Sequence, residues 1–309
     1  MIWGLAAYLM WGLFPAFFPL LQPASPTEIL AHRFVWTLVF MLLLLAAVRG
    51  LKQMRTITGR QWAIVTAAAL LISVNWGLYI YAVNNDHVAD AALGYFINPL
   101  VSVLLGVIVL RERLRRLQLM SVGVATLAVV VLTVALGSPP IISLGLAFSF
   151  GFYGLVKKQV RLTPTQSLTA ETLVLAPVGL IYLWFLQSQG SNTFVQFGVG
   201  HALLLVTAGV VTALPLLCFA RAAQELSLTS LGMIQYITPV LQMLWAVFVT
   251  HEHIAPARWV GFILIWIAVI VFIVDLLRNR PPRVRRVAKT AGSAGEGTGG
   301  GSASGDSGK

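Results

Sequence analysis

The chain has 309 residues, of which 58% are hydrophobic and 10% are charged, and its mean hydropathy is +0.85. A soluble domain is about 45–50% apolar and roughly a quarter charged, so the composition excludes an ordinary soluble enzyme, a disordered chain and a nucleic-acid-binding domain. The single cysteine, Cys218, excludes an intrachain disulfide and a cysteine-based metal site. These numbers predict a membrane protein with several spans.

Ten charge-poor apolar segments approach the length that a helix needs to cross a hydrocarbon core, about 20 residues. The charge-free stretch from Leu117 to Val156 is too long for one span, and Gly137-Ser138-Pro139-Pro140 divides it. The segments lack the alternation of barrel strands, so we expect helices. The first has no basic leader or cleavage site, which favours a retained helix over a signal peptide. The predicted spans are residues 1–21, 27–48, 61–83, 91–110, 117–136, 141–156, 166–186, 201–220, 228–250 and 257–277.

The distribution of lysine and arginine predicts that both termini are cytoplasmic. In that orientation 19 of the 21 basic residues lie on the inner side, and only Arg33 and Arg258 lie on the outer half, in agreement with the positive-inside rule. Residues 278–309 are expected to form a cytoplasmic tail, basic up to Lys289 and then Gly/Ser-rich and disordered. We interpret its charges as a topology anchor that touches anionic lipid, and not as a nucleic-acid site.

An internal repeat appears when the chain is shifted by about 140 residues. Pro99 then aligns with Pro239, and Glu112 with Glu252. Five spans separate equivalent helices, so the second copy must be inverted relative to the first. We therefore expect an all-α membrane protein of ten transmembrane helices in two inverted five-helix repeats, an arrangement typical of secondary transporters. The expected repeats are residues 1–136 and 141–277.

Several motifs resemble one known family. Residues 73–114, above all Leu93-Gly94-Tyr95-Phe96-Ile97-Asn98-Pro99, closely resemble the RarD branch of the EamA permeases, in the drug/metabolite transporter superfamily. The resemblance extends from Met1 to about Leu277. Its further matches are Trp11-Gly12-Leu13-Phe14-Pro15, His32-Arg33 followed by Trp36, the segment 149–155 before Lys157-Lys158, and Glu171 with Pro177.

The resemblance implies a permease that moves a small molecule across a bacterial plasma membrane. The name of the RarD branch is linked to chloramphenicol sensitivity, which suggests traffic of a drug or metabolite without identifying a physiological substrate. Two features depart from the family pattern: the chain begins almost inside the first span, and the long Gly/Ser-rich tail is unusual.

Three polar residues inside predicted spans are candidates for charge-dependent roles, because a charge at mid-bilayer costs at least about 2.5–3.5 kcal/mol. Arg33 either snorkels to the outer interface, attracts an anionic substrate group, or pairs with Glu28 or Glu171. Glu171 is either an N-terminal carboxylate stabilised by its helix dipole or a proton-coupling site, since a buried carboxylate can take up a proton near neutral pH. His32 shares a helix face with Trp36, and a structural hydrogen bond is favoured over a proton relay.

Two polar stripes are related by the repeat. Tyr95, Asn98 and Ser102 follow i, i+3, i+7 spacing in the fourth span, and the same spacing recurs in the ninth. A proline follows the middle member of each stripe and is expected to bend the helix. We interpret the stripes as the lining of a central pathway, with interhelical bonding as the alternative. The second stripe is Gln235, Thr238 and Gln242, with Tyr236 beside it, and the prolines are Pro99 and Pro239.

Aromatic and amide side chains near these stripes complete the expected pathway. Asn75 and Tyr79 are four residues apart in the third span and flank Trp76, while Tyr153 lies in the sixth span. Tryptophan and tyrosine near span ends are more often interface anchors. Spans three, four, eight and nine are expected to bound the site.

No enzyme signature is present: the chain has neither a Walker loop nor a zinc-protease motif, and His251-Glu252-His253 is a bare triplet. We expect no enzyme activity, no metal and no cofactor. The predicted function is a secondary transporter working by alternating access, with Glu171 as a candidate for proton coupling. A channel, a membrane enzyme and a solute-sensing protein without transport remain alternatives. The expected partners are a small-molecule substrate and the lipid bilayer, and a homodimer is open.

Overall fold

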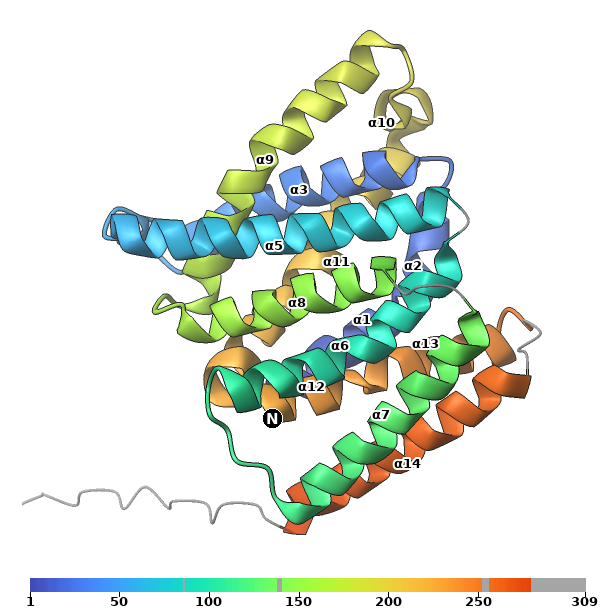
Figure 1. The fold of residues 1–309 in the computed structure, drawn as a ribbon. Helices are drawn as coiled ribbons and strands as arrows, with labels where there is room; N and C mark the ends of the chain where they lie inside the picture. Colours follow the sequence, from blue (N-terminus) through green and yellow to red (C-terminus); the bar gives the residue numbers. More distant parts are fainter. Residues whose placement is uncertain (86, 138–140, 252–255, 279–309) are drawn as a thin grey trace, which may run out of the picture.

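The computed structural model describes residues 1–85, 87–137, 141–251 and 256–278, and Figure 1 shows a bundle in which helices are the only regular elements of that part of the chain. The helices are α1 (Ile2–Gly12), α2 (Phe14–Phe17), η1 (Phe18–Leu21), α3 (Pro26–Ala47), α4 (Leu51–Met54), α5 (Gly59–Asn84), α6 (Val88–Ile108), α7 (Arg116–Leu136), α8 (Ile141–Gln159), α9 (Pro164–Ser188), α10 (Thr193–Gln196), α11 (Gly198–Glu225), α12 (Leu228–Gln235), α13 (Ile237–Phe248) and α14 (Pro256–Arg278).

Nine helical segments of the described chain are long and apolar enough to cross a membrane, and they coincide with the first nine predicted spans. The first segment, Ile2–Leu21, comprises α1, α2 and η1, and the ninth, Leu228–Phe248, comprises α12 and α13. The last helix, α14, contains a shorter apolar stretch, Trp259–Asp275. The predicted turn at 138–140, the tail after Arg278 and the pairing of Glu112 with Glu252 involve residues outside the described part.

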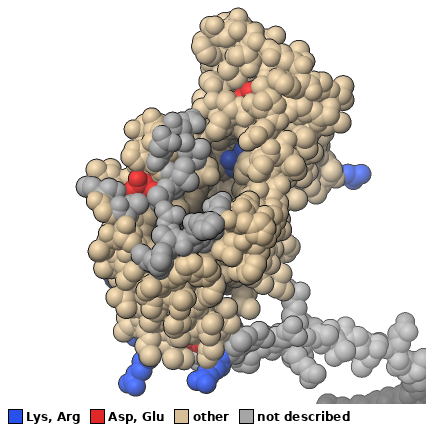
Figure 2. Space-filling model, turned by 90° about the vertical axis from the view of Figure 1, so that its right-hand side faces the viewer, with Lys and Arg blue, Asp and Glu red and all other residues tan. Residues whose placement is uncertain are grey.

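The outward surfaces of the helices are apolar. Leu43, Trp184 and Val199 have 65%, 73% and 76% of their surface exposed. Exposed apolar surface on this scale would drive aggregation in water, whereas lipid tails accommodate it. Figure 2, which looks onto the right-hand end of Figure 1, shows few charged atoms on the face it presents.

Side-chain caps fix where several long helices begin. Ser25 and Thr163 have extended backbone conformations and accept hydrogen bonds from the N–H groups of Glu28 and Gln166. In both cases a proline follows at the first helical position, where its missing N–H has no cost. The polar caps thus end the loops and start α3 and α9 in the same way.

The two repeat-related prolines differ in their effect on the helix assignment. A break separates α12 from α13 at Tyr236, three residues before Pro239, because proline has no N–H to donate to the carbonyl of Gln235. By contrast, α6 continues as one helix through Pro99. A bend at Pro99 stays a prediction.

Consecutive long helices run in opposite directions (Figure 1), so the connections after α3, α6, α8 and α11 gather at the left-hand end, near the N-terminus. We call this the basic end, and the opposite one the far end. The basic residues that give it this name are Arg49, Lys52, Arg55, Arg60, Arg111, Arg113, Arg115, Arg116, Lys158, Arg161 and Arg221.

Helix contacts link the two halves of the chain throughout. Helix α3 packs on α9 and α11, α5 on α8 and α9, α6 on α8 and α12, and α1 on α11, α12 and α13. Helices α7 and α14 lie side by side along the lower edge in Figure 1. Glycines allow the tightest crossings: a Cβ on Gly209 would lie 2.4 Å from the backbone carbon of Trp36, and one on Gly232 would lie 2.9 Å from the carbonyl oxygen of Pro99.

Candidate functional site

A narrow pocket lies between α3, α5, α9 and α11, with about 280 Å³ of empty space when the open solvent at its mouth is included, and room inside for roughly one water molecule. Arg33 and Glu171 are its charged lining residues, and the rest of its wall is mainly apolar. Figure 2 shows a hollow in the far-end face, with the blue surface of a basic side chain inside it. The pocket therefore shares only α5 and α11 with the site expected from the sequence. The remaining lining residues are Phe34, Thr37, Ile72, Trp76, Leu168, Thr172, Leu175, Thr212 and Leu216.

Arg33 turns into this pocket and does not pair with a carboxylate of the described chain. Its guanidinium lies 4.1 Å from the ring centroid of Trp76 and 5.5 Å from that of Phe18, distances at which a cation is attracted to the ring face. Its Nε donates a 2.9 Å hydrogen bond to Oγ1 of Thr212. The expected partner Glu28 instead accepts bonds from the backbone N–H and hydroxyl of Thr193, at 2.7 and 2.9 Å.

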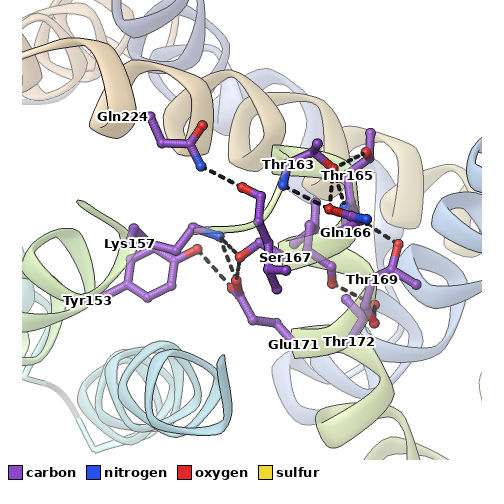
Figure 3. Close-up of polar contacts among 12 residues, drawn as sticks. Tyr153, Lys157, Thr163, Thr165, Gln166, Ser167, Thr169, Glu171, Thr172 and Gln224 are labelled. Atoms are coloured by element: carbon purple, nitrogen blue, oxygen red, sulfur yellow. Dashed lines mark hydrogen bonds and ion pairs between the residues drawn. The ribbon is translucent and has the colours of Figure 1, made fainter. Parts of the chain in front are cut away.

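Glu171 lies in a buried polar cluster between α8 and α9 (Figure 3). Its Oε1 is 2.5 Å from Nζ of Lys157 and accepts a 2.7 Å bond from Ser167, and its Oε2 accepts a 3.1 Å bond from the hydroxyl of Tyr153. Lys157 also donates to Ser167 at 2.7 Å. The side chains of Lys157 and Glu171 are each 2% exposed. Paired charges with filled hydrogen-bonding sites are the form in which ions persist in an apolar interior.

Lys157 corrects one sequence-based expectation. The predicted sixth span ended at residue 156, which left Lys157 outside it among the basic residues of the inner side, but Lys157 lies in the last turn of α8 and is buried. A signal was present in the sequence. Lys157 is four residues after Tyr153, so both side chains share one helix face, and a carboxylate at Glu171 needs a cation nearby.

The two polar stripes form hydrogen bonds between helices. Thr238 donates a 2.9 Å bond to the carbonyl oxygen of Tyr8, and Gln242 donates a 3.3 Å bond to that of Trp11. With its amide turned so that the nitrogen faces the carbonyls, Asn98 donates to Ala147 at 2.8 Å. These contacts correspond to the bonding alternative, and a role of the stripes in a pathway stays a prediction.

The other predicted residues lie on several sides of the core. Asn75 donates to the carbonyl oxygen of Leu146 and to Ser149, so it joins α5 to α8. Trp76 lines the pocket. The remaining residues have the following places: Tyr79 and Tyr95 form a ring pair with centroids 6.0 Å apart, Ser102 is buried against Gly232, Gln235 is buried with its Oε1 unbonded in the described structure, and Tyr236 donates to the carbonyl oxygen of Phe96.

His32 forms a hydrogen bond and a ring contact inside the bundle, and its role stays a prediction. Its Nδ1 accepts a 3.2 Å bond from the indole N–H of Trp36, and its ring stacks on Phe194. It does not line the pocket. No group of three or more histidine, cysteine or acidic residues that could hold a metal occurs in the described part of the chain, and Glu252 and His253 of the triplet lie outside it.

Thr238→Val is expected to lower the free energy of unfolding by about 1–3 kcal/mol, because the buried carbonyl of Tyr8 loses its side-chain donor. Thermal unfolding of the detergent-purified protein measures the change. Thr126→Val is the matched control, since Thr126 is exposed and bonds only to Val122 of its own helix. Equal shifts for the two variants would contradict a stabilising bond between α13 and α1.

Polar contacts also close the basic end of the bundle. Gln224, at the end of α11, donates a 2.8 Å bond to the carbonyl oxygen of Leu162, and Lys158 donates to that of Leu226. Glu112 accepts bonds from the first two backbone N–H groups of α12. Together with the cluster around Glu171, these contacts tie α8, α9, α11 and α12 to one another.

The apolar outer surface and the membrane-length helices define a multi-pass membrane protein. The chain belongs to the EamA-like transporter family, whose pattern matches residues 1–134 and again residues 139–274. The resemblance seen in the motifs is thereby confirmed.

Relatives place it near RarD. It is 50% identical over 281 residues to Protein RarD of Streptomyces exfoliatus, covering 90% of this chain and 89% of that protein. It is 42% identical over 288 residues to Protein RarD of Escherichia coli, covering 93% and 96%. A protein of known crystal structure has the same fold, with a TM-score of 0.70 and 18% identity over 91% of this chain and 98% of that one.

Proposed function

We propose that the protein is a secondary transporter, which moves a small metabolite or drug across a bacterial plasma membrane by alternating access to the pocket between α3, α5, α9 and α11. The observation that carries the proposal is the asymmetry of the two ends. Polar contacts tie the basic end shut, whereas the far-end face is hollowed (Figure 2). A solute in the pocket is therefore separated from the basic end by the buried pair Lys157–Glu171.

An inverted repeat supplies the means to exchange the two ends. If α1, α3, α5 and α6 are equivalent to α8, α9, α11 and α12–α13, the observed contacts map onto one another: α3 on α11 becomes α9 on α5, and α6 on α8 becomes α12–α13 on α1. The two matches to one family pattern, residues 1–134 and 139–274, also support two copies. Under this proposal α14 is the tenth span, and the repeats are 1–136 and 141–277.

The same symmetry relates individual hydrogen bonds. Asn98 bonds to Ala147 as Thr238 bonds to Tyr8, and each pair joins the fourth helix of one repeat to the first helix of the other. Two halves with matched contacts can adopt each other's conformations at similar energy. In the conformation open at the basic end, each repeat would then adopt the conformation that the other repeat has here.

The membrane orientation follows from the basic end. Arginine and lysine gather there, and the positive-inside rule places such loops in the cytoplasm, so both termini are proposed to be cytoplasmic. The conformation with a hollowed far end would face outward. A homodimer stays a prediction.

We also propose that Glu171 couples transport to protons, which the pH dependence of transport tests. A proton on Glu171 would remove the charge that holds Lys157, and so weaken the closure of the basic end. The other groups near Glu171 are Tyr153 from α8 and Arg33 across the pocket. Glu171→Gln is expected to abolish the pH dependence of transport in proteoliposomes. Transport by Glu171→Gln with the same pH dependence as the original protein would show that another group couples.

Flux measurements separate transport from its rivals. A thermal-shift screen of amino acids, nucleobases, organic cations and chloramphenicol would identify a ligand, because a ligand at a hundredfold excess over its Kd stabilises the folded state by about 2.7 kcal/mol. Its flux into proteoliposomes should saturate and should show counterflow. Flux that does not saturate would indicate a channel, and binding without flux would indicate a sensor.

A further inference from the structure

Arg33 and Glu171 occupy equivalent positions in the two copies of the proposed repeat. Each is the eighth residue after the N-cap residue of its helix, Ser25 for α3 and Thr163 for α9. The first helical turns also match, with Pro-Thr-Glu in one and Pro-Thr-Gln in the other. Because α3 enters from the far end and α9 from the basic end, the arginine and the glutamate reach the same pocket from opposite sides.

The neighbours of these two charges are also equivalent. Gly12 and Gly151 make the same close approach, to Leu241 and Val101 respectively, which sets the register of the first helix of each repeat. In that register Phe18 corresponds to Lys157.

The structure thus contains two corresponding contacts of opposite character. Glu171 faces Lys157 at 2.5 Å and is neutralised. Arg33 faces the ring of Phe18, 5.5 Å from its centroid, and has no described carboxylate partner. In the alternative conformation the far end would be closed in the way that the basic end is closed here. The guanidinium of Arg33 would then lose its access to water. A buried cation without a counter-ion is costly, by several kcal/mol for a real protein ion.

We propose that Arg33 binds the carboxylate of a small monoanionic substrate. At the far end this carboxylate neutralises Arg33, as Lys157 neutralises Glu171 at the basic end. The inference rests on the proposed transporter and adds the class of its substrate. The Nε of Arg33 is held by Thr212, whereas Nη1 and Nη2 have no acceptor among the described residues. A guanidinium held in this way presents its remaining donors to a carboxylate as a fork.

The composition of the pocket indicates a single negative charge on the ligand. Arg33 is its one basic lining residue, and the buried cation Lys157 is already paired with Glu171. A doubly charged phosphate would leave one charge uncompensated. The flat rings of Trp76 and Phe34 stack with centroids 5.8 Å apart and offer an apolar surface for the body of the substrate.

Equilibrium binding to the detergent-purified full-length protein tests the inference without requiring transport. The probes are carboxylic acids and their primary amides in pairs, such as lactate with lactamide, benzoate with benzamide and nicotinate with nicotinamide, together with inorganic phosphate. Thermal shift ranks the probes, and titration calorimetry gives Kd. We expect at least one acid to stabilise the protein at 10 mM, and its amide and phosphate to do so much less.

Arg33→Gln is expected to weaken binding of that acid roughly 30- to 100-fold, the loss of a charge-assisted hydrogen-bonded pair. Arg33→Lys keeps the charge without the fork and should weaken it by roughly tenfold. Arg221→Gln is the control, because Arg221 is exposed and pairs with Glu225 at the basic end. Stabilisation by amides or phosphate as strong as that by acids, an acid whose Kd is unchanged in Arg33→Gln, or no effect of any acid would each overturn the inference.

Phe18→Glu is a second test that leaves Arg33 in place. The new carboxylate would stand where Lys157 stands in the other repeat, so it should occupy the guanidinium, raise the Tm of the ligand-free protein and abolish acid binding. Undiminished acid binding by Phe18→Glu would contradict the inference. An acid that binds through Arg33 and is never transported would overturn the proposed transporter alone. A transported neutral solute whose flux survives Arg33→Gln would overturn the substrate class alone.

Discussion

Lys157→Met is expected to lower the free energy of unfolding by about 3–5 kcal/mol, because it leaves the carboxylate of Glu171 buried without its cation. Both side chains are 2% exposed, and Ser167 and Tyr153 bond to the same carboxylate, so water cannot replace the ammonium without opening the cluster. Chemical or thermal unfolding of the purified protein in detergent measures the effect. Closure of the basic end should fail as well, which transport assays detect.

The double variant Lys157→Met/Glu171→Leu tests whether the lost stability comes from the unpaired charge or from lost packing. Replacing both partners of a buried ion pair by apolar groups of similar volume is often neutral or stabilising, so most of the lost stability should return. Proton coupling through Glu171 would not return, because leucine cannot bind a proton. Arg221→Gln breaks a pair whose side chains are 53% and 37% exposed, and should cost no more than about 1 kcal/mol. A mild effect of Lys157→Met, equal to that of Arg221→Gln, would contradict the role of the buried pair.

Gly209→Ala is expected to have the second large effect, because it drives α11 away from α3. The added Cβ would lie 2.4 Å from the backbone carbon of Trp36 and 2.7 Å from the backbone nitrogen of Thr37, and neither backbone atom can turn aside as a side chain can. Overpacking of this kind typically costs about 1–3 kcal/mol, occasionally more. Thr37 also donates a 3.1 Å bond to the carbonyl oxygen of Gly209, which the separation would break.

The control for this prediction is Gly123→Ala in α7, where nothing beyond the adjoining backbone of its own helix lies within 4 Å of the new Cβ. Alanine favours a helix by about 1 kcal/mol over glycine, so this variant should be neutral or more stable. Because α3 and α11 both line the pocket, Gly209→Ala should also lose ligand binding. Wild-type stability of Gly209→Ala would mean that the two helices do not cross at this glycine.

The positions of the membrane spans were predictable because hydropathy and the length of a helix are local properties. The predicted spans 117–136 and 166–186 match α7 and α9 to within two residues at each end. The break at Tyr236 was signalled by Pro239. Family membership could be read from one heptapeptide motif and is confirmed over most of the chain.

The candidate site was less predictable, because its residues meet only through tertiary packing. Sequence spacing predicted that Asn98 and Thr238 lie on two polar stripes. It could not show whether these side chains line a pathway or bond to a carbonyl of a neighbouring helix. Thr212 was missed, since an isolated threonine carries no signal until Arg33 is placed beside it. The equivalence of Arg33 and Glu171 was missed for a different reason: the single shift of 140 residues hides a register of 138 between α3 and α9.

Accessibility of a cysteine in the pocket tests alternating access most directly. In a Cys218→Ala background, Thr172→Cys places a thiol on the wall that α9 contributes, and a membrane-impermeant maleimide is applied to oriented vesicles from either side. We predict labelling from both sides, and loss of labelling from the outer side alone when the far end is locked by a cross-link. Labelling of the unlocked protein from one side only would contradict the proposed mechanism. Labelling of the locked protein from both sides would also contradict it.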